Sequence, residues 1–350
     1  MLHWEITKGD QQMTVSFCVI AYNEEKNMES LFSDIRKQDY PHDKMEIIFV
    51  NAMSTDKTKY LMEQFAKEEN GFIRVRVIDN PKKIQAAGWN VAIKAASEDI
   101  ILRVDAHTMI PKDFVSNSAK SIESGEYVTG GPRPNIVDES TPWKHTLLLA
   151  ETSLFGSSIA PYRKSNHKTY VKSVFHGAYR REVFEKAGLF DESLGRTEDN
   201  ELHYRIRKAG YKICYDPRIV SYQHSRGTWR EMIRQKYGNG FWIGLTLGVC
   251  PKCFSVFHFV PLFFVLSILA SIIFALLGLL YPFKVLLIIY ILINLMMSVL
   301  AIRGQKFYLQ YLMLPFIFLS LHLSYGIGTL VGLIKMPIWK KKRKKRNLEQ

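Results

Sequence analysis

Short apolar runs alternate with amphipathic segments in the first part of the chain. The runs have the length of strands and are rich in β-branched residues; they cover Val15–Ala21, Met45–Val50, Ile73–Ile78 and Ile100–Val104. The segments between them repeat their apolar residues with a helical period and cover Lys26–Gln38, Thr55–Glu69 and Ile84–Ala96. Alternating strands and helices predict an α/β fold with a mostly parallel sheet and covering helices.

Local signals mark the ends of two helices. Ser54–Asp56 offers side chains that can cap the second helix. A later helix is expected from near Thr197 to Gly210, where glycine is a good C-cap. Residues 132–175 show a weaker pattern and are expected to form loops and short helices rather than another strand–helix unit.

The hydrophobic pattern changes near residue 250. From Phe254 to Ile334 the only charged residues are Lys284, Arg303 and Lys306. Three apolar segments lie in this stretch, each near or above the roughly 20 residues needed to cross a bilayer; they are Phe254–Leu280, Val285–Ile302 and Phe307–Ile334. We therefore predict a multi-pass membrane protein.

Charge patterning indicates the orientation of the chain. Residues 1–10 lack the apolar stretch of a secretory signal, so the soluble part is expected to face the cytoplasm. Much of the net charge of +14 lies in Lys340–Arg346, which carries seven positive charges. Such runs often bind nucleic acid, but this one follows a membrane segment, which favours anionic lipid headgroups instead.

The basic tail conflicts with three full crossings. Clusters of Lys and Arg beside a membrane segment stay on the cytoplasmic side, and three crossings would place the C-terminus outside. An even number of crossings resolves the conflict, so one apolar segment is expected to lie in the interface or re-enter. The first is a candidate, because Pro261 lies near its start.

Two further features lie around the membrane region. Gly238–Gly248 is amphipathic and aromatic, which suits a segment at the membrane interface. Cys250 and Cys253 have the spacing of zinc ligands, but no second pair completes a site. We expect a juxtamembrane turn with free thiols there, and no disulfide framework among the four cysteines.

Candidate chemistry begins where the fourth predicted strand ends, at Asp105-Ala106-His107. Ligands of open α/β sheets gather outside the carboxyl ends of strands, and an Asp/His pair can hold a divalent cation beside a phosphate. A turn residue at a strand end is the alternative interpretation of Asp105 alone. A second acidic cluster, Arg196–Glu201, opens a helical pattern. Together the two clusters indicate group transfer from a phosphorylated donor.

Several motifs in this order resemble those of family 2 glycosyltransferases. Tyr22-Asn23-Glu24-Glu25 resembles the family's first-strand motif, and Asn51–Thr58 its Asp-x-x-Ser-Thr-Asp-x-Thr element. Asp105–His107 corresponds to the Asp-x-Asp motif, and Glu198-Asp199 to the Glu-Asp motif. The Asp-Ala-His variant is similar to the succinoglycan glucosyltransferase-like branch, as are Phe175–Ala178, Glu198–Leu202 and His322–Gly328.

The resemblance implies a GT-A-like, Rossmann-related catalytic domain that binds a nucleotide sugar, most often a UDP-sugar. It implies that backbone groups around Ala21 and Tyr22, with Glu24, hold the nucleoside. Asn51 stands where the family usually has Asp, and its side-chain oxygen can still accept a hydrogen bond from the uracil ring. Lys83 would face the diphosphate, with a solvated surface lysine as the alternative.

The resemblance also implies a divalent metal on the diphosphate. Asp105 and His107 would bind it, and an imidazole ligand favours Mn²⁺ over Mg²⁺. His224 resembles the third metal ligand of related enzymes, with an ordinary loop histidine as the alternative.

Asp199 would be the general base, which accepts the proton of an acceptor hydroxyl. Direct displacement by that hydroxyl would invert the anomeric centre. Glu198 would orient the acceptor. The segment Gln235, Lys236 and Tyr237 lies where the family carries its acceptor-side helix, and a helix that binds headgroups is the alternative interpretation.

We therefore predict a membrane-bound, inverting glycosyltransferase that adds one sugar to a lipid-linked saccharide in exopolysaccharide or capsule assembly. Its expected domains are residues 1–235 (catalytic), 236–253 (interfacial, acceptor side), 254–335 (membrane) and 336–350 (polybasic tail). A processive polysaccharide synthase and a catalytically silent scaffold are the competing hypotheses. His322, inside the last apolar segment, is expected to bond to a neighbouring helix rather than to act in catalysis.

Overall fold

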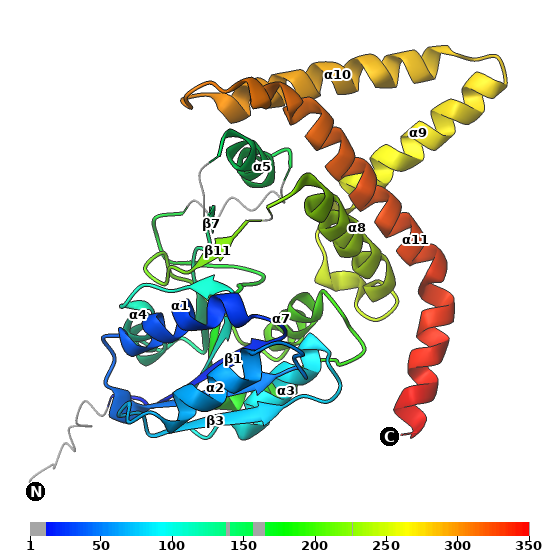
Figure 1. The fold of residues 1–350 in the computed structure, drawn as a ribbon. Coiled ribbons are helices and arrows are strands. Elements are labelled where there is room, and N and C mark those ends of the chain that lie inside the picture. Colours follow the sequence, from blue (N-terminus) through cyan, green and yellow to red (C-terminus); the bar gives the residue numbers. More distant parts are fainter. Residues whose placement is uncertain (1–11, 138–140, 157–164, 226, 350) are drawn as a thin grey trace, which may run out of the picture. The chain divides into compact units, whose positions relative to one another are not determined.

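The computed structural model describes residues 12–137, 141–156, 165–225 and 227–349. The chain divides into two compact units. The first is built from residues 1–133, 162–190 and 205–221, and the second from residues 134–161, 191–204 and 222–350. Figure 1 shows both units as ribbons.

The first unit is built on an eight-stranded mixed sheet with the order β3-β2-β1-β4-β9-β6-β10-β8 (Figure 1). Its strands are β1 (Val15–Ala21), β2 (Met45–Asn51), β3 (Arg74–Asp79), β4 (Ile100–Asp105), β6 (Val128–Gly130), β8 (Thr169–Tyr170), β9 (Ala178–Arg180) and β10 (Ile213–Tyr215). The first four are parallel to one another, and β9 is antiparallel to both β4 and β6. The predicted α/β fold is therefore confirmed, with strand boundaries within one residue of those expected.

Helices cover both faces of this sheet. One face carries α1 (Glu25–Arg36), α2 (Thr58–Lys67) and α4 (Phe114–Glu123), whose apolar side chains join alternate strand residues in one core. The other face carries α3 (Gln85–Ala95). Buried Trp89 of α3 stacks against the guanidinium of buried Arg103 at 4.3 Å, an arrangement in which the ring face stabilises the cation.

The start of α2 differs from the prediction. The helix begins at Thr58, and its N-cap Lys57 makes no side-chain capping bond. Asp56 still accepts a hydrogen bond from the Thr58 N–H, whereas Ser54 and Thr55 bond to the loop after β1. Ser54 and Thr55 therefore join two loops instead of capping the helix.

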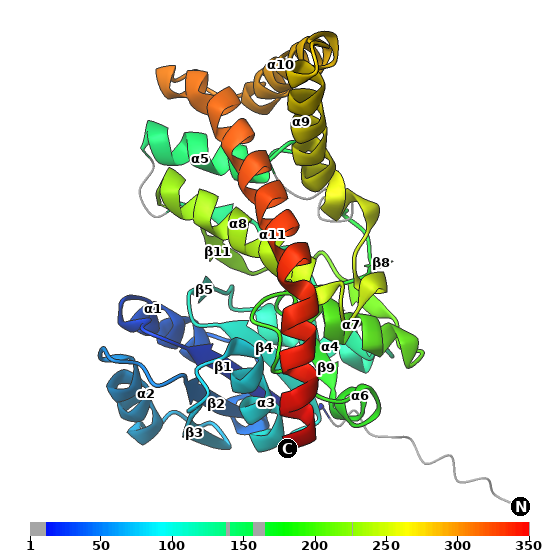
Figure 2. The same cartoon turned by 90° about the vertical axis from the view of Figure 1, so that its right-hand side faces the viewer.

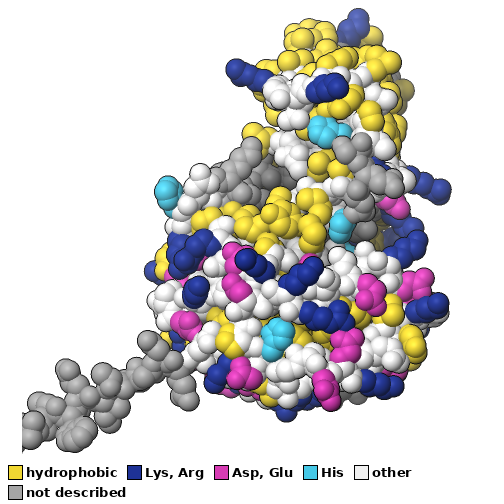
Figure 3. Space-filling view, turned by 60° about the vertical axis from the view of Figure 1, so that its left-hand side comes forward, with side chains coloured by type: hydrophobic (Ala, Val, Ile, Leu, Met, Phe, Trp, Pro, Cys, Tyr) yellow, Lys and Arg dark blue, Asp and Glu magenta, His cyan; other side chains and the backbone are white. Residues whose placement is uncertain are grey.

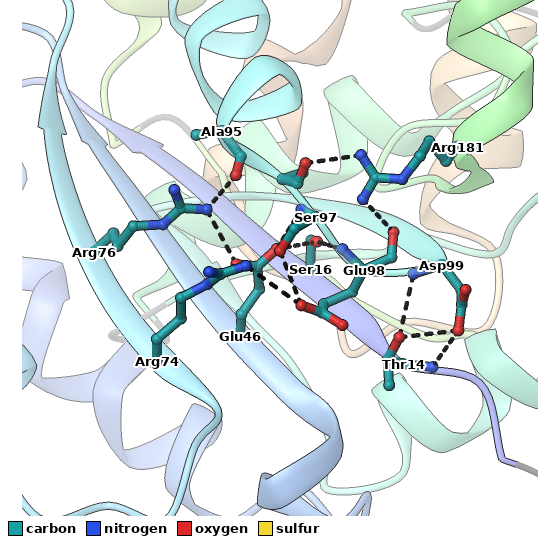
Figure 4. Close-up of polar contacts among 11 residues, drawn as sticks. Thr14, Ser16, Glu46, Arg74, Arg76, Ala95, Ser97, Glu98, Asp99 and Arg181 are labelled. Atoms are coloured by element: carbon teal, nitrogen blue, oxygen red, sulfur yellow. Dashed lines mark hydrogen bonds and ion pairs between the residues drawn. The ribbon is translucent and has the colours of Figure 1, made fainter.

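A polar network crosses the amino-terminal edge of the sheet (Figure 4). Fully buried Glu46 accepts hydrogen bonds from Ser16, from Ser97 and from the guanidinium groups of Arg74 and Arg76. Burial alone would raise the pKa of the Glu46 carboxyl, but these hydrogen bonds outweigh it and lower the pKa to about 2. The carboxylate therefore stays ionised in the folded protein.

This network predicts acid sensitivity. Because the folded pKa of Glu46 lies below its unfolded value, its contribution to stability is complete above about pH 4.5 and is lost as the pH falls towards 2. We expect Glu46→Gln to lower the free energy of unfolding at pH 7 by about 2 kcal/mol and to flatten the pH dependence in that window. Urea unfolding of purified protein between pH 3 and 7 measures both effects. An unchanged pH profile in Glu46→Gln would contradict the assignment.

The second unit is mainly helical (Figures 1 and 2). Its helices are α5 (Pro142–Thr152), α8 (Trp229–Thr246), α9 (Val260–Leu276), α10 (Tyr281–Ile302) and α11 (Leu314–Glu349), and strands β7 (Asn135–Ile136) and β11 (Tyr222–His224) pair in parallel. Helix α7 (Glu198–Lys208) begins in this unit and ends in the first. As predicted, α7 is followed by Gly210 with positive φ.

Among the residues that the structure describes, three helices are long and apolar enough to cross a membrane, and they coincide with the three apolar segments expected from hydropathy. They cover Val256–Leu276, Tyr281–Ile302 and Leu309–Lys345. Figure 3 shows mainly hydrophobic side chains over α9 and α10, and both signs of charge over the first unit. A large exposed apolar surface is unfavourable in water and suits a lipid environment.

Glycines let α8 and α11 approach closely, and the two helices lie side by side in Figures 1 and 2. A Cβ added to Gly332 of α11 would clash with the carbonyl oxygen of Phe241, and one added to Gly328 would clash with that of Tyr237. Gly244 of α8 faces Gly332 in return. The small residues of α11 therefore form a face that contacts α8.

His322 of α11 bonds to two neighbours. Its Nε2 lies 2.6 Å from the Phe155 carbonyl oxygen, to which it donates, and its Nδ1 lies 3.0 Å from the Tyr290 hydroxyl on α10. A neutral imidazole satisfies both contacts, since one nitrogen donates and the other accepts. The expected bond to a neighbouring helix is confirmed.

The expectation of free thiols at Cys250 and Cys253 is wrong. A 3₁₀ turn at Pro251–Cys253 brings the two Cα atoms to 5.5 Å, and the structure joins the sulfurs in a disulfide. That Cα separation is in the usual range for a disulfide. Cys18 and Cys214 are free and buried.

Candidate active site

The carboxyl ends of four neighbouring strands carry most of the predicted donor-binding residues. Asp79 of β3, Asn51 of β2 and Ala21 of β1 are in register across the sheet. Asp105, the last residue of β4, pairs with Ile20 of β1. The sheet therefore places these positions side by side on one edge, although they are far apart in sequence.

Strained backbone marks the loops at this edge. Asn23, Met53 and Lys83 follow β1, β2 and β3, and each has positive φ. Asn23 receives a hydrogen bond from the Thr55 N–H, and its own N–H donates to Ser54. Non-glycine residues in this conformation cluster at functional sites, where surrounding contacts hold them.

Asn51, predicted to contact the nucleobase, is buried and bonds to two neighbours in the protein. It is only 2% exposed, its side-chain oxygen accepts a hydrogen bond from the Ser54 N–H, and its amide nitrogen donates to Asp79 at 2.8 Å. Asp79 is more exposed and also binds Lys59 at 2.6 Å. Lys59 and Asn51 together lower the pKa of Asp79. The exposed carboxylate beside the end of β2 is therefore that of Asp79 on β3, a residue that the sequence analysis did not identify.

Asp105 lies beside a buried histidine that the sequence reasoning had quoted only as part of a motif. His176 Nε2 lies 3.4 Å from Asp105 Oδ2 and 3.2 Å from Thr108 Oγ1, and its Nδ1 lies 2.8 Å from Ser221 Oγ. Burial would raise the pKa of Asp105, but the contact with His176 lowers it well below its usual value. Burial lowers the pKa of His176. Asp105 is therefore ionised at neutral pH.

Glu24, expected to hold the nucleoside, contacts His107. Glu24 Oε1 lies 3.2 Å from His107 Nδ1, and Glu24 Oε2 accepts a hydrogen bond from Asn27. A carboxylate on one ring nitrogen is the usual way to orient a histidine that binds a metal through the other. Among the residues that the structure describes, no three His, Cys, Asp or Glu side chains are grouped to hold a metal.

The remaining donor-side residues differ in exposure. The Ala21 carbonyl accepts a hydrogen bond from the Ala52 N–H, whereas Tyr22 is 53% exposed and faces solvent. Lys83 is exposed on the loop before α3. Tyr22 and Lys83 are thus accessible to a ligand, and Ala21 is not accessible through its carbonyl.

The acidic and acceptor-side residues belong to the second unit. Glu198 and Asp199 occupy the first turn of α7, directly after Thr197, which has positive φ. His224 ends β11, where it pairs with Ile136 of β7. Both carboxylates therefore lie at the amino-terminal end of α7, where the helix dipole favours negative charge.

The predicted acceptor-side residues lie on α8, together with other polar and aromatic side chains. Gln235 and Lys236 are half-buried and Tyr237 is exposed. The ring of Tyr237 stacks on Phe241 one turn later. This helix also contains the predicted interfacial segment from Gly238 onwards.

Comparison with known proteins identifies the family of the chain. Residues 16–188 match the model of glycosyl transferase family 2. The chain is a family 2 glycosyltransferase. This match includes the loops after β1 and β2, Asp105–His107 and His176, and it confirms the family to which the sequence motifs pointed.

Two relatives extend the similarity. The chain is 26% identical over 327 residues to a dolichyl N-acetyl-α-D-glucosaminyl phosphate 3-β-D-2,3-diacetamido-2,3-dideoxy-β-D-glucuronosyltransferase of Methanococcus voltae, covering 92% of this chain and 97% of the relative. It is 28% identical over 233 residues to the succinoglycan biosynthesis protein ExoA of Rhizobium meliloti, covering 65% of this chain and 68% of the relative. The second relative agrees with the branch indicated by the motifs.

A solved structure supports the fold. A mannosyltransferase of Pyrobaculum calidifontis, in complex with GDP-Man and Mn²⁺, superposes with a TM-score of 0.59 at 19% identity, over 91% of this chain and 87% of that one. The likeness covers the GT-A-like sheet and the helices that follow it.

Proposed function

We propose that this glycosyltransferase moves a sugar from a nucleotide-sugar donor to a lipid-linked saccharide, with inversion, in the assembly of an exopolysaccharide or capsule. The observation that carries the proposal is the placing of polar residues at the ends of β3, β2 and β4, in one row with the end of β1. Three strand spacings of about 4.8 Å separate Asp79 from Asp105, about 14 Å in total. An extended nucleoside diphosphate covers such a distance from base to β-phosphate.

In this proposal the base lies at the β2–β3 end of the row. Asp79, oriented by Asn51 and Lys59, accepts a hydrogen bond from a ring N–H of the base. Uracil offers one such N–H, so a UDP-sugar remains the proposed donor. Tyr22 lies on the loop after β1 between the two ends, where its exposed ring can contact the nucleoside.

The diphosphate would lie at the β4 end, where the donor set fits a divalent metal. Asp105 supplies an ionised oxygen ligand, and His107 supplies a ring nitrogen oriented by Glu24. Metals bound to phosphates usually need only one or two protein ligands, and the nitrogen donor favours Mn²⁺ over Mg²⁺. Such a metal neutralises charge on the leaving diphosphate. His224 is kept as a possible third ligand, and Lys83 as a diphosphate contact.

Asp199 is proposed as the general base, and Glu198 as the residue that orients the acceptor. One base is sufficient for direct displacement, because the acceptor hydroxyl attacks as it loses its proton. The acceptor's lipid would lie along α8, near Gln235, Lys236 and Tyr237. The relative from Methanococcus voltae, which is matched over nearly its whole length, acts on a dolichyl-linked saccharide according to its name. This supports single transfer to a lipid carrier rather than processive synthesis.

A chelation experiment tests the metal. We expect EDTA to abolish transfer from a UDP-sugar to lipid-linked acceptors, because charge on the departing diphosphate would then be uncompensated. Mn²⁺ should restore activity at least as well as Mg²⁺. Radiolabelled sugar in the lipid fraction, measured in native membranes, reports the transfer. Full activity in the chelator would exclude a metal at Asp105 and His107.

We further propose that α9 and α10 form the membrane-crossing hairpin and that α11 lies at the cytoplasmic interface. Helix α8 carries four charged residues (Arg230, Glu231, Arg234 and Lys236) and packs along α11 from Ser320 to Leu333. A helix with so many charges does not cross a bilayer core, so its packing partner is not expected to cross either. The sequence pattern favoured the first apolar segment as the one that does not cross the membrane. We propose the last segment instead.

The charges beside the helices agree with this topology. The short connection between α9 and α10 (residues 277–280) has no charge, whereas Arg303, Lys306 and the tail would all be cytoplasmic. Reporters inserted after Gly278, Gln305 and Gln350 should be active outside, inside and inside, respectively. An outside reporter after Gln350 would show that α11 crosses.

A further inference from the structure

The last turns of α11 contact the loop that leads into the catalytic helix. Arg343 Nη2 lies 2.7 Å from Asp191 Oδ2, and Arg343 Nε donates to Ser193 Oγ at 2.8 Å. All three side chains belong to the second unit. Ser193 lies six positions before Asp199, so the contact lies close in sequence to the proposed base.

The partners of Arg343 form an ordered turn. Asp191 Oδ1 accepts hydrogen bonds from the Ser193 N–H and from the Ser193 hydroxyl. Burial would raise the pKa of Asp191, but its bonds with Ser193 and Arg343 lower it. The side chains of Arg343 and Asp191 are only 25% and 18% exposed, so solvent screens this ion pair less than one at the open surface. Its geometry, with two donors on one guanidinium, is directional.

Helix α8 holds the rest of the same loop. A Cβ on Gly195 would clash with the indole of Trp242, Arg196 donates to Asn239 at 2.8 Å, and the hydroxyls of Thr197 and Thr246 are 2.7 Å apart. Thr197 has φ +70° directly before Glu198 and Asp199. A β-branched residue keeps such a conformation only where its surroundings impose it.

We propose that Arg343 is a positioning residue, which fixes the loop 191–197 and thereby the first turn of α7. The inference rests on the proposed role of Asp199, and it gives one residue of the basic tail a function other than contact with lipid. Helices α8 and α11, which are proposed to lie at the membrane interface, would thus position the catalytic base. A base displaced by about 1 Å loses up to a hundredfold in rate, whereas donor binding on the first unit does not depend on this loop.

The test compares full-length variants in an uncharged detergent, where no anionic lipid is present. Arg343→Ala is expected to lower kcat tenfold to a hundredfold and to leave the KM for donor and the melting temperature unchanged. Arg343→Lys, which can form one of the two bonds, should recover part of the rate. Lys341→Ala removes the same charge from an exposed position of the tail and should match the wild-type enzyme.

A double-mutant cycle with Asp191→Ala adds a second measurement. If Arg343 acts through Asp191, the double variant should be no slower than the slower single variant. Equal losses in Arg343→Ala and Lys341→Ala, or additive losses in the cycle, would overturn the proposal. Failure of the proposed function has a different signature: Asp199→Asn would then retain activity, whatever the behaviour of Arg343→Ala.

Discussion

Asp199→Asn should bind the nucleotide-sugar donor normally and lose most of its transferase activity. Asparagine keeps the size of the side chain and its place in the first turn of α7, but it does not accept a proton. Loss of a general base lowers rates by 10²- to 10⁴-fold. Donor affinity, measured by calorimetry with the nucleoside diphosphate, and kcat, measured with lipid-linked acceptor, separate the two effects.

Glu198→Gln is the matched control for this experiment. The two carboxylates are adjacent in the same helical turn, so a general disturbance of the turn would affect both variants alike. We expect Glu198→Gln to raise the KM for acceptor and to retain more of kcat than Asp199→Asn. Near-normal turnover in Asp199→Asn would remove that residue from its proposed role, and a reversed order would assign the base to Glu198.

Gly332→Ala should destabilise the protein, although alanine is the better helix former. In an isolated helix, replacing glycine by alanine stabilises the helix by about 1 kcal/mol. Here the added Cβ would meet the Phe241 carbonyl oxygen and the backbone of Gly244 on α8. Rigid backbone on the opposing helix has little room to move, and overpacking of this kind costs about 1–3 kcal/mol. The melting temperature in detergent should fall, and the monodisperse fraction in gel filtration should shrink.

Gly227→Ala provides the comparison. A Cβ on Gly227 would meet nothing within 4 Å, so this variant should melt at the wild-type temperature. If Gly332→Ala melted at or above the wild-type temperature, α8 and α11 would not be in close contact. Their packing, and the proposal that α11 does not cross the membrane, would then lose their main support.

The elements of the first unit could be predicted because each depends on a local pattern. The run Val15–Ala21 is identical in prediction and structure, and Asp105 ends β4 as its place after an apolar run indicated. Within the described part of the chain, the helices long and apolar enough to cross a membrane followed from hydropathy in the same way. In each case the structure is decided by burial of a strand or of a helix face. The hydrophobic pattern of neighbouring residues predicts that burial directly.

The candidate site was only partly predictable, because its contacts join residues that are distant in sequence. No residue near Asn51 in the sequence indicates that its side-chain amide would donate a hydrogen bond to Asp79. This contact depends on the register of β2 with β3. The same is true of His176, which reaches Asp105 from a segment 71 residues away. Strand register is set by the packing of the whole sheet and not by either strand alone.

The sequence by itself determined the α/β fold, the family, the apolar segments and the placing of Asp105 and Asp199 at element ends, since these depend on local periodicity and on motifs. Only the tertiary structure decided that Glu24 bonds to His107, that Asn51 donates a hydrogen bond to Asp79, and that Arg343 binds the loop before Asp199. Those contacts depend on which surfaces come together when apolar faces are buried, and hydrogen bonds then form between whichever polar groups that packing brings within reach.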